Sequence, residues 1–228
     1  MAIKPRDMAK MIDHTNLNPT ATVDDIKVLC NEAREHEYAS VCINPIFVPL
    51  ASKLLKDSSV KVDTVIGFPL GASTSETKAF ATRNVIKDGA QEIDMVMNLG
   101  AFKSEALDLV KYDIKAVVDS TKNAGVTSDI IVKVIIETCY LNEEEIVTAC
   151  EICRDAGADF IKSSTGFGPQ AAKVEDIGLM RKTVGRDIGI KAAGGIHNFK
   201  EALAMLDAGA NRIGASSGVQ IVTDEKDD

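Results

Sequence analysis

The chain has 228 residues, of which 45% are hydrophobic, and its mean hydropathy is close to zero. This length and composition fit one α/β barrel with a full core, and an aromatic content of 4% without Trp indicates an interior of aliphatic side chains. The net charge of −8 argues against non-specific nucleic-acid binding, which needs clustered Lys and Arg.

Short runs rich in β-branched residues alternate with amphipathic segments along the chain. The predicted strands are Met11–Asp13, Ser40–Ile43, Lys61–Gly67, Glu92–Asn98, Ile131–Glu137, Phe160–Ser164, Ile188–Ala193 and Arg212–Ser216. The helical patterns include Val23–Arg34, Ser75–Lys87, Glu105–Asn123, Glu143–Asp155 and Lys200–Leu206. Eight such units predict the α/β class and a single-domain (β/α)8 TIM barrel. We expect residues 1–220 to form this barrel and residues 221–228 to be a flexible acidic tail.

The compartment can also be read from the sequence. No apolar run is long enough to span a bilayer, and the N-terminal segment has no apolar core of a signal peptide. Five cysteines do not suggest a disulfide framework, so we expect a cytoplasmic protein without a membrane partner. Cys150 and Cys153 form one C-x-x-C in a helical pattern, and we expect them to pack on the core rather than bind zinc.

A weak repeat, in KDGAQEIDM, RDAGADFIK and LDAGANRIG, relates three of the units. Its glycines are typical of helix ends, and a strand follows each of them. These glycines are Gly89, Gly157 and Gly209, and the residues five positions later are Asp94, Lys162 and Gly214. Alternate strands of a barrel contribute to a common interior layer. The fourth, sixth and eighth strands should therefore bring Asp94 and Lys162 together, with Gly214 leaving room beside them.

Three lysines interrupt apolar strands: Lys133, Lys162 and Lys191. Buried lysine is rare unless it is paired, so each could simply form a salt bridge, for example with Asp94 or Glu137. Three in consecutive strands favour a functional interpretation, because nearby carboxylates are expected to be too few to neutralise them all.

The close approach of two lysines has a chemical consequence. Two ammonium groups about 5 Å apart at an effective dielectric near 20 repel by about 3 kcal/mol, or roughly two pKa units. Desolvation acts in the same direction, so one lysine is expected to be neutral near physiological pH. A neutral amine beside Asp94, which could orient it and move protons, predicts Schiff-base chemistry.

Glycines and serines follow the last two strands, at Gly194-Gly195 and in the segment from Gly214 to Gly218. Barrel enzymes often bind phosphate here on backbone N–H groups at the start of a short extra helix, with Ser216 or Ser217 as additional donors. The alternative is ordinary turn glycines with a serine helix cap. Thr165–Gly168 could close the far side of the same pocket.

Metal and nucleotide chemistry find no support in the motifs. The three histidines, His14, His36 and His197, do not pair at metal-ligand spacing, and there is no P-loop or G-x-G-x-x-G after a strand. We therefore predict no metal and no cofactor. His14 is expected near the barrel mouth in a packing or hydrogen-bonding role, and His36 on the surface.

At these residues the sequence resembles the deoxyribose-phosphate aldolases, a class I aldolase family. The similar stretches are IDHTNLNPTAT, SVCINP, GFPLGAS, EIDMVMNLGAFKS, VKVIIETCYL, GADFIKSSTGFG, IKAAGGI and AGANRIGASSGVQIV. They run in order over nearly the whole chain, and the last four are specific in combination.

The resemblance implies reversible cleavage of 2-deoxy-D-ribose 5-phosphate to D-glyceraldehyde 3-phosphate and acetaldehyde, in deoxyribonucleoside catabolism. It also implies a homodimer that needs no metal or cofactor. Lys162 matches the Schiff-base lysine, and Asp94 and Lys191 match a proton-relay pair in which Lys191 also favours the neutral amine. The other residues that match are Lys133 in a supporting polar network, Gly166, Gly195, Ser216 and Ser217 at the phosphate, and Asp13 and Thr15 at the sugar-binding mouth.

The chain departs from the family in three places. Pro169–Ala172 replaces a longer glycine-bearing run, His197 stands where many members carry Arg, and the ending TDEKDD lacks a tail tyrosine found in some members. Two other functions stay open, since scaffold alone does not decide chemistry. One is another sugar-phosphate enzyme such as a transaldolase or an isomerase. The other is a phosphosugar-binding protein that has lost its chemistry.

Overall fold

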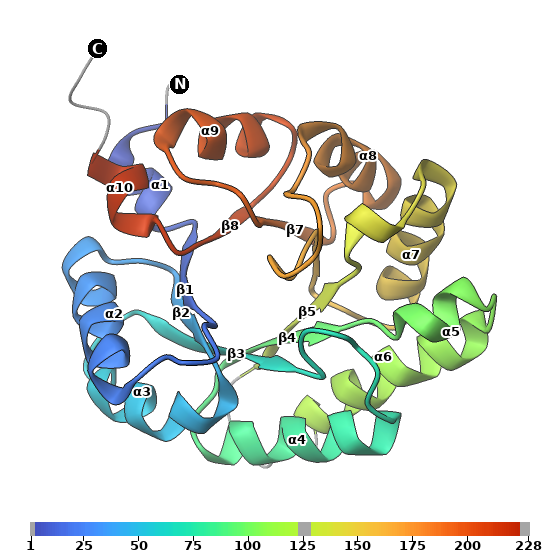
Figure 1. Ribbon diagram of the computed structural model, residues 1–228, viewed down its shortest axis with the longest axis horizontal. Coiled ribbons are helices and arrows are strands. Elements are labelled where there is room, and N and C mark those ends of the chain that lie inside the picture. The colour runs from blue at the N-terminus through green and yellow to red at the C-terminus, as the bar shows by residue number, and fades with distance from the viewer. Residues whose placement is uncertain (1–2, 123–128, 224–228) are drawn as a thin grey trace.

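Eight parallel strands form a closed barrel in the computed structural model, which describes residues 3–122 and 129–223. Each strand pairs with the next along the chain, and β8 pairs with β1 to close the ring, around which the helices lie (Figure 1). The strands are β1 (Ile12–Asn16), β2 (Ser40–Ile43), β3 (Lys61–Ile66), β4 (Glu92–Val96), β5 (Ile131–Ile135), β6 (Phe160–Lys162), β7 (Gly189–Ala193) and β8 (Arg212–Ala215). The predicted α/β class and the single-domain (β/α)8 barrel are confirmed.

Helices fill the connections between the strands. They are α1 (Pro5–Ala9), α2 (Val23–His36), α3 (Val48–Leu54), α4 (Ser75–Lys87), α5 (Leu99–Lys103), α6 (Leu107–Lys122), α7 (Glu143–Asp155), α8 (Val174–Val184), α9 (Phe199–Asp207) and α10 (Gly218–Thr223), with the 3-10 turns η1 (Pro45–Phe47) and η2 (Thr138–Tyr140). The predicted bounds of α4 and α7 match the structure. Helix α10 continues past residue 220 and buries Ile221, and residues 224–228 of the expected tail lie outside the described residues.

Most of the other predicted boundaries differ from the structure by one to three residues, and two of these differences have a clear local cause. Helix α6 begins at Leu107 rather than at Glu105, because Glu105 has a left-handed backbone (φ 58°) that ends the separate helix α5; the predicted end, Asn123, lies outside the described residues. Strand β1 continues to Asn16 rather than stopping at Asp13, because Thr15 and Asn16 still pair with β2. Their polar side chains hid the strand from a search for apolar runs.

The helix ends follow from local sequence signals. The Thr22 hydroxyl accepts from the N–H of Asp25, whose carboxylate accepts from the N–H of Thr22, so a capping box starts α2. The three repeat glycines stop α4, α7 and α9 because each adopts a positive φ that favours glycine. These are Gly89 (φ 111°), Gly157 (φ 88°) and Gly209 (φ 117°), so the predicted role of the repeat is confirmed.

Aliphatic residues from the strands and the inner helix faces form the core. Cys150 and Cys153 of α7 are completely buried in it, which confirms the packing role expected for the C-x-x-C. The centre of the barrel differs from this apolar core, because charged side chains from several strands place their ionisable groups there. These are Asp13, Asp63, Glu92, Asp94, Lys133, Lys162 and Lys191, none more than 2% exposed.

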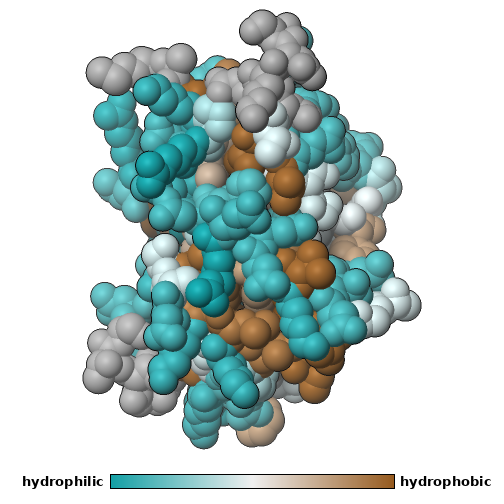
Figure 2. Space-filling model, turned by 90° about the vertical axis from the view of Figure 1, so that its left-hand side faces the viewer, coloured by the Kyte–Doolittle hydropathy of each residue, from teal (hydrophilic) through white to brown (hydrophobic). Residues whose placement is uncertain are grey.

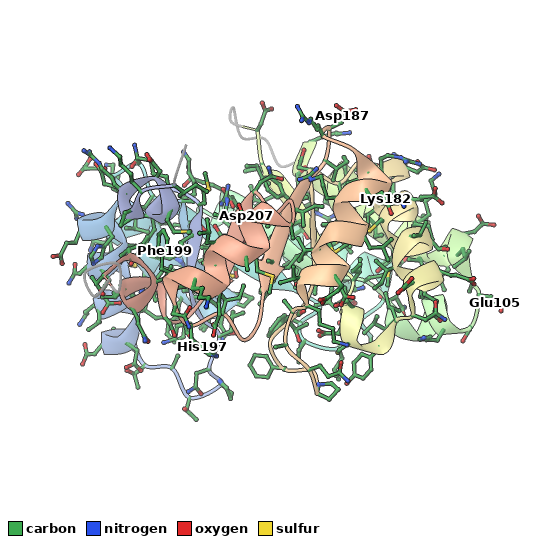
Figure 3. The ribbon with its side chains drawn as sticks, turned by 90° about the horizontal axis from the view of Figure 1, so that it is seen from above. Glu105, Lys182, Asp187, His197, Phe199 and Asp207 are labelled. Carbon is green, nitrogen blue, oxygen red and sulfur yellow. The ribbon has the colours of Figure 1, made fainter. Side chains whose placement is uncertain are left out.

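The two ends of the barrel are distinguished by the loops that they carry. His197, just after β7, lies at one end, and Asp187, just before β7, lies at the opposite end (Figure 3). The end near His197 carries the loops that follow the strands, where barrel enzymes place their sites. Among the helices of residues 3–122 and 129–223, none combines the length and apolar character needed to cross a membrane.

Candidate active site

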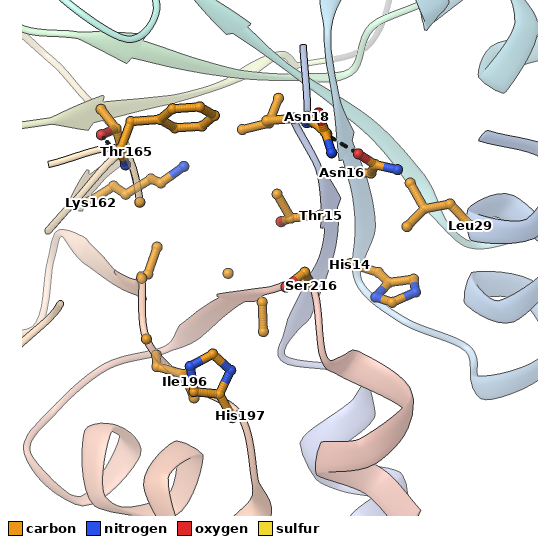
Figure 4. Close-up of a pocket in the computed structure, with 18 of the residues that line it drawn as sticks. His14, Thr15, Asn16, Asn18, Leu29, Lys162, Thr165, Ile196, His197 and Ser216 are labelled. Carbon is orange, nitrogen blue, oxygen red and sulfur yellow. Dashed lines mark hydrogen bonds between the residues drawn. The ribbon is translucent and has the colours of Figure 1, made fainter. Parts of the chain in front are cut away.

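A cavity of about 660 Å³ opens at the carboxyl ends of β1, β6, β7 and β8. Its walls come from five segments, spread between residues 14 and 216, that meet at this end of the barrel (Figure 4). They contribute His14–Asn18 with β1, Asp25, Val28, Leu29 and Glu32 of α2, Lys162 and Thr165–Phe167 with β6, Ala193–His197 with β7, and Gly214–Ser216 with β8.

Lys162 projects from β6 into this cavity, and its side chain points across toward β1 (Figure 4). It is only 2% exposed, and its Nζ donates to Oδ2 of Asp94 at 2.8 Å. The predicted meeting of Asp94 and Lys162 inside the barrel is therefore confirmed. Lys162 has the fewest carboxylate partners of the three strand lysines, since Asp94 is the one carboxylate recorded within 4 Å of its Nζ among the described residues.

Lys191 and Lys133 lie deeper and are fully buried. The Nζ of Lys191 contacts Oδ2 of Asp94 at 2.7 Å, of Asp13 at 2.5 Å and of Asp63 at 3.1 Å. The Nζ of Lys133 contacts Oε2 of Glu92 at 2.6 Å, Oδ1 of Asp94 at 2.9 Å and Oδ2 of Asp63 at 3.0 Å. Both lysines are thus surrounded by carboxylates.

Arg212 of β8 completes the set, since its Nη1 lies 2.6 Å from Oδ1 of Asp13 and 3.0 Å from Oε2 of Glu92. We call these residues the interior ion cluster: Asp13, Asp63, Glu92, Asp94, Lys133, Lys162, Lys191 and Arg212. The expectation of too few carboxylates was wrong, because the cluster holds four of them and four basic side chains. Asp63, Glu92 and Arg212 were not recognised as partners because register and barrel closure decide which strand residues share a depth.

The cluster sets the charge of its members. Burial alone would lower the pKa of Lys191, but Asp13, Asp94 and Asp63 outweigh it and raise that pKa well above its usual value. Burial is likewise outweighed at Lys133, whose pKa is raised by Asp63 and Asp94. Both lysines are therefore cations, and neither of them is the neutral lysine that the sequence led us to expect.

The carboxylates divide into two kinds. Burial would raise the pKa of Asp94, but Lys133, Lys162 and Lys191 together hold it well below its usual range. At Asp63 burial prevails with the help of the Asp94 charge, and its pKa is raised to about 6 although Lys133 and Lys191 oppose this. Asp94 is therefore ionised at neutral pH, whereas the pKa of Asp63 lies close to neutral pH.

Gly214 makes space for this arrangement. A Cβ at this position would lie 3.0 Å from Cε of Lys191 and 3.0 Å from Cβ of Ala193. The room expected beside the lysines is present, and Lys191 occupies it.

The predicted phosphate residues are only partly gathered at the cavity. Gly166, Gly195 and Ser216 line it, while Ser217 does not appear in its wall and its carbonyl accepts from the N–H of Ile221 in α10. The segment Pro169–Ala172 folds against Gly194-Gly195, where the Ala172 N–H donates to the Gly194 carbonyl at 3.1 Å. The glycine-rich rim is therefore braced by this loop.

Glu137, suggested above as a salt-bridge partner for a lysine, instead holds the loop after β6. Its carboxylate accepts from the Thr165 N–H at 3.1 Å and from the Thr165 hydroxyl. Phe167 on the same loop reaches Phe68 after β3 in an edge-to-face contact, with ring centroids 5.3 Å apart. These contacts fix the side of the cavity opposite β1.

The β1 residues divide between the wall and the interior. Thr15 lines the cavity, whereas Asp13 is fully buried in the interior ion cluster, below the mouth where it was expected. His14 has a buried side chain whose Nε2 lies 2.7 Å from Oε2 of Glu32, and burial lowers its pKa more than Glu32 raises it. The expected position and hydrogen-bonding role of His14 are confirmed, but Glu32 was not anticipated.

Some of these acidic groups are close enough together to hold a cation. The ligand atoms of Asp13, Asp63 and Glu92 lie within 4.8 Å of one another. The ammonium groups of Lys133 and Lys191 contact these three carboxylates and already supply the positive charge that balances them. The chemistry available here is that of amines and carboxylates.

Comparison with known proteins agrees with this chemistry. The model of the DeoC/LacD family aldolase matches residues 7–223. A deoxyribose-phosphate aldolase of Caldanaerobacter subterraneus subsp. tengcongensis is 58% identical over 220 residues, covering 96% of this chain and 94% of that protein. One of Thermococcus gammatolerans is 56% identical over 218 residues, covering 95% of each.

Solved structures show the same relationship. The aldolase QR15 has a TM-score of 0.90 and 43% identity, covering 96% of this chain and 95% of that one. The deoxyribose phosphate aldolase of Aeropyrum pernix, described as a unique tetramer, has a TM-score of 0.89 and 31% identity, covering 98% and 93%. The lysine-bearing barrel and these matches together place the chain in the DeoC/LacD family of aldolases.

Proposed function

We propose that the protein catalyses reversible aldol cleavage of 2-deoxy-D-ribose 5-phosphate to D-glyceraldehyde 3-phosphate and acetaldehyde, through a Schiff base on Lys162. The observation that carries this proposal is the position of Lys162. Its side chain reaches the cavity and contacts one carboxylate, while Lys133 and Lys191 are sealed below it among several. The two relatives from Caldanaerobacter and Thermococcus described above are named deoxyribose-phosphate aldolase, which agrees with this reaction.

In this mechanism the neutral Nζ of Lys162 attacks the aldehyde carbon of the open-chain sugar, and loss of water gives an iminium. The iminium accepts the electron pair of the breaking C2–C3 bond, and a base takes the proton of the C3 hydroxyl. Water activated by Asp94 and Lys191 is the proposed base. The enamine is then protonated, and hydrolysis releases acetaldehyde. Positioned proton transfer of this kind is typically worth about 10²–10⁴-fold.

The phosphate of the substrate is proposed to lie at the glycine-rich rim. Gly166, Gly195 and Ser216 belong to three different loops that converge on the cavity. Gly166 and Gly195 have positive φ values of 85° and 72°, which other residues rarely adopt, and glycine lets an anion approach the backbone closely. The open-chain sugar would then extend from this rim toward Lys162.

Borohydride trapping tests the proposal. The protein is incubated with acetaldehyde, reduced with sodium borohydride and digested, and mass spectrometry is expected to find an ethyl group on Lys162. Lys162→Ala should abolish both the label and the release of glyceraldehyde phosphate in a coupled assay. Phosphosugar binding without an adduct would support a binding protein, and turnover without an adduct would support an isomerase.

We also propose that the protein is a cytoplasmic homodimer. Figure 2 views the side that carries α2 and α3, where hydrophobic residues gather over the lower part; Val28 of α2 (55% exposed) and Ile46 of η1 (79% exposed) are among the exposed hydrophobic residues. Exposed apolar side chains that gather on one face are typical of interaction surfaces. The cysteines are all free, as expected in a reducing compartment. Light scattering coupled to size exclusion should give twice the chain mass.

A further inference from the structure

Asp63 of β3 lies at the centre of the interior ion cluster, although the mechanism above gives it no role. It is fully buried, and its Oδ2 contacts Nζ of Lys133 at 3.0 Å and Nζ of Lys191 at 3.1 Å. Its Oδ1 has no hydrogen-bond partner among the described residues. A buried carboxylate oxygen without a donor is costly, so this oxygen adds to the free-energy cost of keeping Asp63 ionised.

Titratable and charged groups from six other strands act on Asp63; β6, which carries Lys162, is the exception. Lys133 and Lys191 come from β5 and β7, while Asp94 and Glu92 come from β4. The remaining groups are Asp13 of β1, the thiol of Cys42 on β2 and Arg212 of β8. The pKa values of Asp13 and Asp94 are lowered, whereas that of Asp63 is raised to about 6. Asp63 therefore accepts a proton most readily of the three.

The charge balance of the cluster gives this difference a use. With all groups ionised, the four basic residues and the four acidic residues of the cluster cancel. Conversion of Lys162 to the neutral amine would leave one uncompensated negative charge in a buried site. Such a charge is strongly disfavoured unless a proton is retained nearby.

Resting on the proposed Schiff-base function, we propose that Asp63 is a positioning residue that stores the proton released by Lys162 when it becomes a nucleophile. A hydrogen-bonded chain connects the two groups. Oδ2 of Asp94 is 2.8 Å from Nζ of Lys162 and 2.7 Å from Nζ of Lys191, which in turn is 3.1 Å from Oδ2 of Asp63.

The transfer conserves charge. The Lys191 ammonium first gives a proton to Asp63 and becomes an amine. This amine then takes a proton from Asp94 as Asp94 takes one from the Lys162 ammonium. Asp94 ends as a carboxylate and Lys191 as an ammonium, while Lys162 becomes a neutral amine and Asp63 a neutral acid. No proton leaves the cluster and its net charge does not change, so the neutral amine forms without leaving an unbalanced charge in the buried interior.

Asp63→Asn tests the store directly, because the amide is permanently uncharged like the protonated acid. The initial rate of borohydride-trapped labelling of Lys162 by acetaldehyde is measured against pH. We expect the midpoint of this pH dependence to lie lower in Asp63→Asn than in wild type, by roughly one to two pH units, since the anion that favours the ammonium is gone. An unchanged midpoint would overturn the proposal.

Asp113→Asn is a matched control. Asp113 of α6 is also buried and paired with a lysine, Lys78 of α4, at 2.5 Å, but this pair lies outside the barrel. It should lower stability without moving the labelling midpoint. A midpoint moved equally by both variants would mean that loss of any buried ion pair is sufficient, which contradicts a store at Asp63. Asp63→Ser replaces Asp63→Asn if the amide does not fold.

Infrared spectroscopy of Lys162→Met locates the proton without relying on turnover. This variant removes the positive charge, so the cluster should take up a proton and show a carboxylic acid C=O band at neutral pH. The band should vanish in the Lys162→Met, Asp63→Asn double variant; persistence of the band would assign the proton to another carboxyl. Wild type that takes no label on Lys162 would instead refute the Schiff-base function itself.

Discussion

Lys162 and Lys191 donate to the same atom, Oδ2 of Asp94, at 2.8 and 2.7 Å. One carboxylate oxygen therefore joins the side chain that faces the cavity to the side chain that is sealed beneath it. Any change in the charge of Lys162 is felt by Lys191 through Asp94, and through Lys191 by the rest of the interior ion cluster. This shared acceptor is the basis of the predictions that follow.

Asp94→Asn should reduce kcat by about 10²–10⁴, because it removes the carboxylate that activates the proposed base while keeping the side-chain shape. KM should change little, since Asp94 itself does not line the cavity and reaches it only through Lys162. Steady-state kinetics with 2-deoxy-D-ribose 5-phosphate provide the measurement. Asp113→Asn should keep the wild-type kcat, and wild-type turnover in Asp94→Asn would contradict the relay.

Gly214→Ala should impair both folding and catalysis. The added Cβ would lie 3.0 Å from Cε of Lys191, and Lys191 has little freedom to move because three carboxylates hold its Nζ. We expect a loss of about 1–3 kcal/mol in unfolding free energy and a fall in kcat of up to about 10²-fold.

Gly178→Ala provides the comparison for Gly214→Ala. Gly178 lies inside α8, and a Cβ there would meet nothing within 4 Å. Alanine is favoured over glycine in a helix, so this variant should be stabilised by about 0.5–1 kcal/mol with unchanged kcat. Urea unfolding and kinetics of both variants decide the point; equal behaviour would show that Gly214 is not needed for Lys191.

Ser216→Asp should raise KM for 2-deoxy-D-ribose 5-phosphate by about 10–100-fold. The new carboxylate would lie at the rim proposed for the phosphate, and like charges about 4 Å apart repel by about 1–4 kcal/mol there. KM for unphosphorylated 2-deoxy-D-ribose should stay the same. Ser217→Asp should have a smaller effect, because Ser217 does not appear in the cavity wall. An equal loss with both sugars would place the phosphate elsewhere.

The stability of wild type should depend on the ionisation of Asp63. Its folded pKa, about 6, lies above the unfolded value near 3.8, so its contribution is complete below about pH 4 and is lost as pH rises through about 6. Asp94 acts oppositely, since its lowered pKa gives stability above about pH 4 that is lost at lower pH.

Asp63→Asn isolates this contribution. Between pH 4 and pH 7 the unfolding free energy of the variant, relative to wild type, should rise by about 3 kcal/mol, the equivalent of roughly two pKa units. Urea unfolding at several pH values gives the difference directly. Parallel curves for the two proteins would show that Asp63 has an ordinary pKa.

The amino-acid pattern was sufficient to predict the barrel and the Asp94–Lys162 pair at its centre. Alternating apolar runs and amphipathic segments predicted eight strands, because each kind of segment has its own hydrophobic period. The repeat around Gly89, Gly157 and Gly209 placed Asp94 and Lys162 at equal depth, because a glycine that ends a helix starts the next strand at a fixed offset.

The charged neighbours of this pair could not be predicted, because they depend on how the strands close into the barrel. Asp63, Glu92 and Arg212 lie on different strands, and 149 positions separate Asp63 from Arg212 in the sequence. Closure of the barrel brings their charges together. The sequence predicted one neutral lysine among three, and only the structure shows that carboxylates hold Lys133 and Lys191 as cations. Electrostatic energies depend on distances of a few ångströms, and those distances exist only after the strands have found their register.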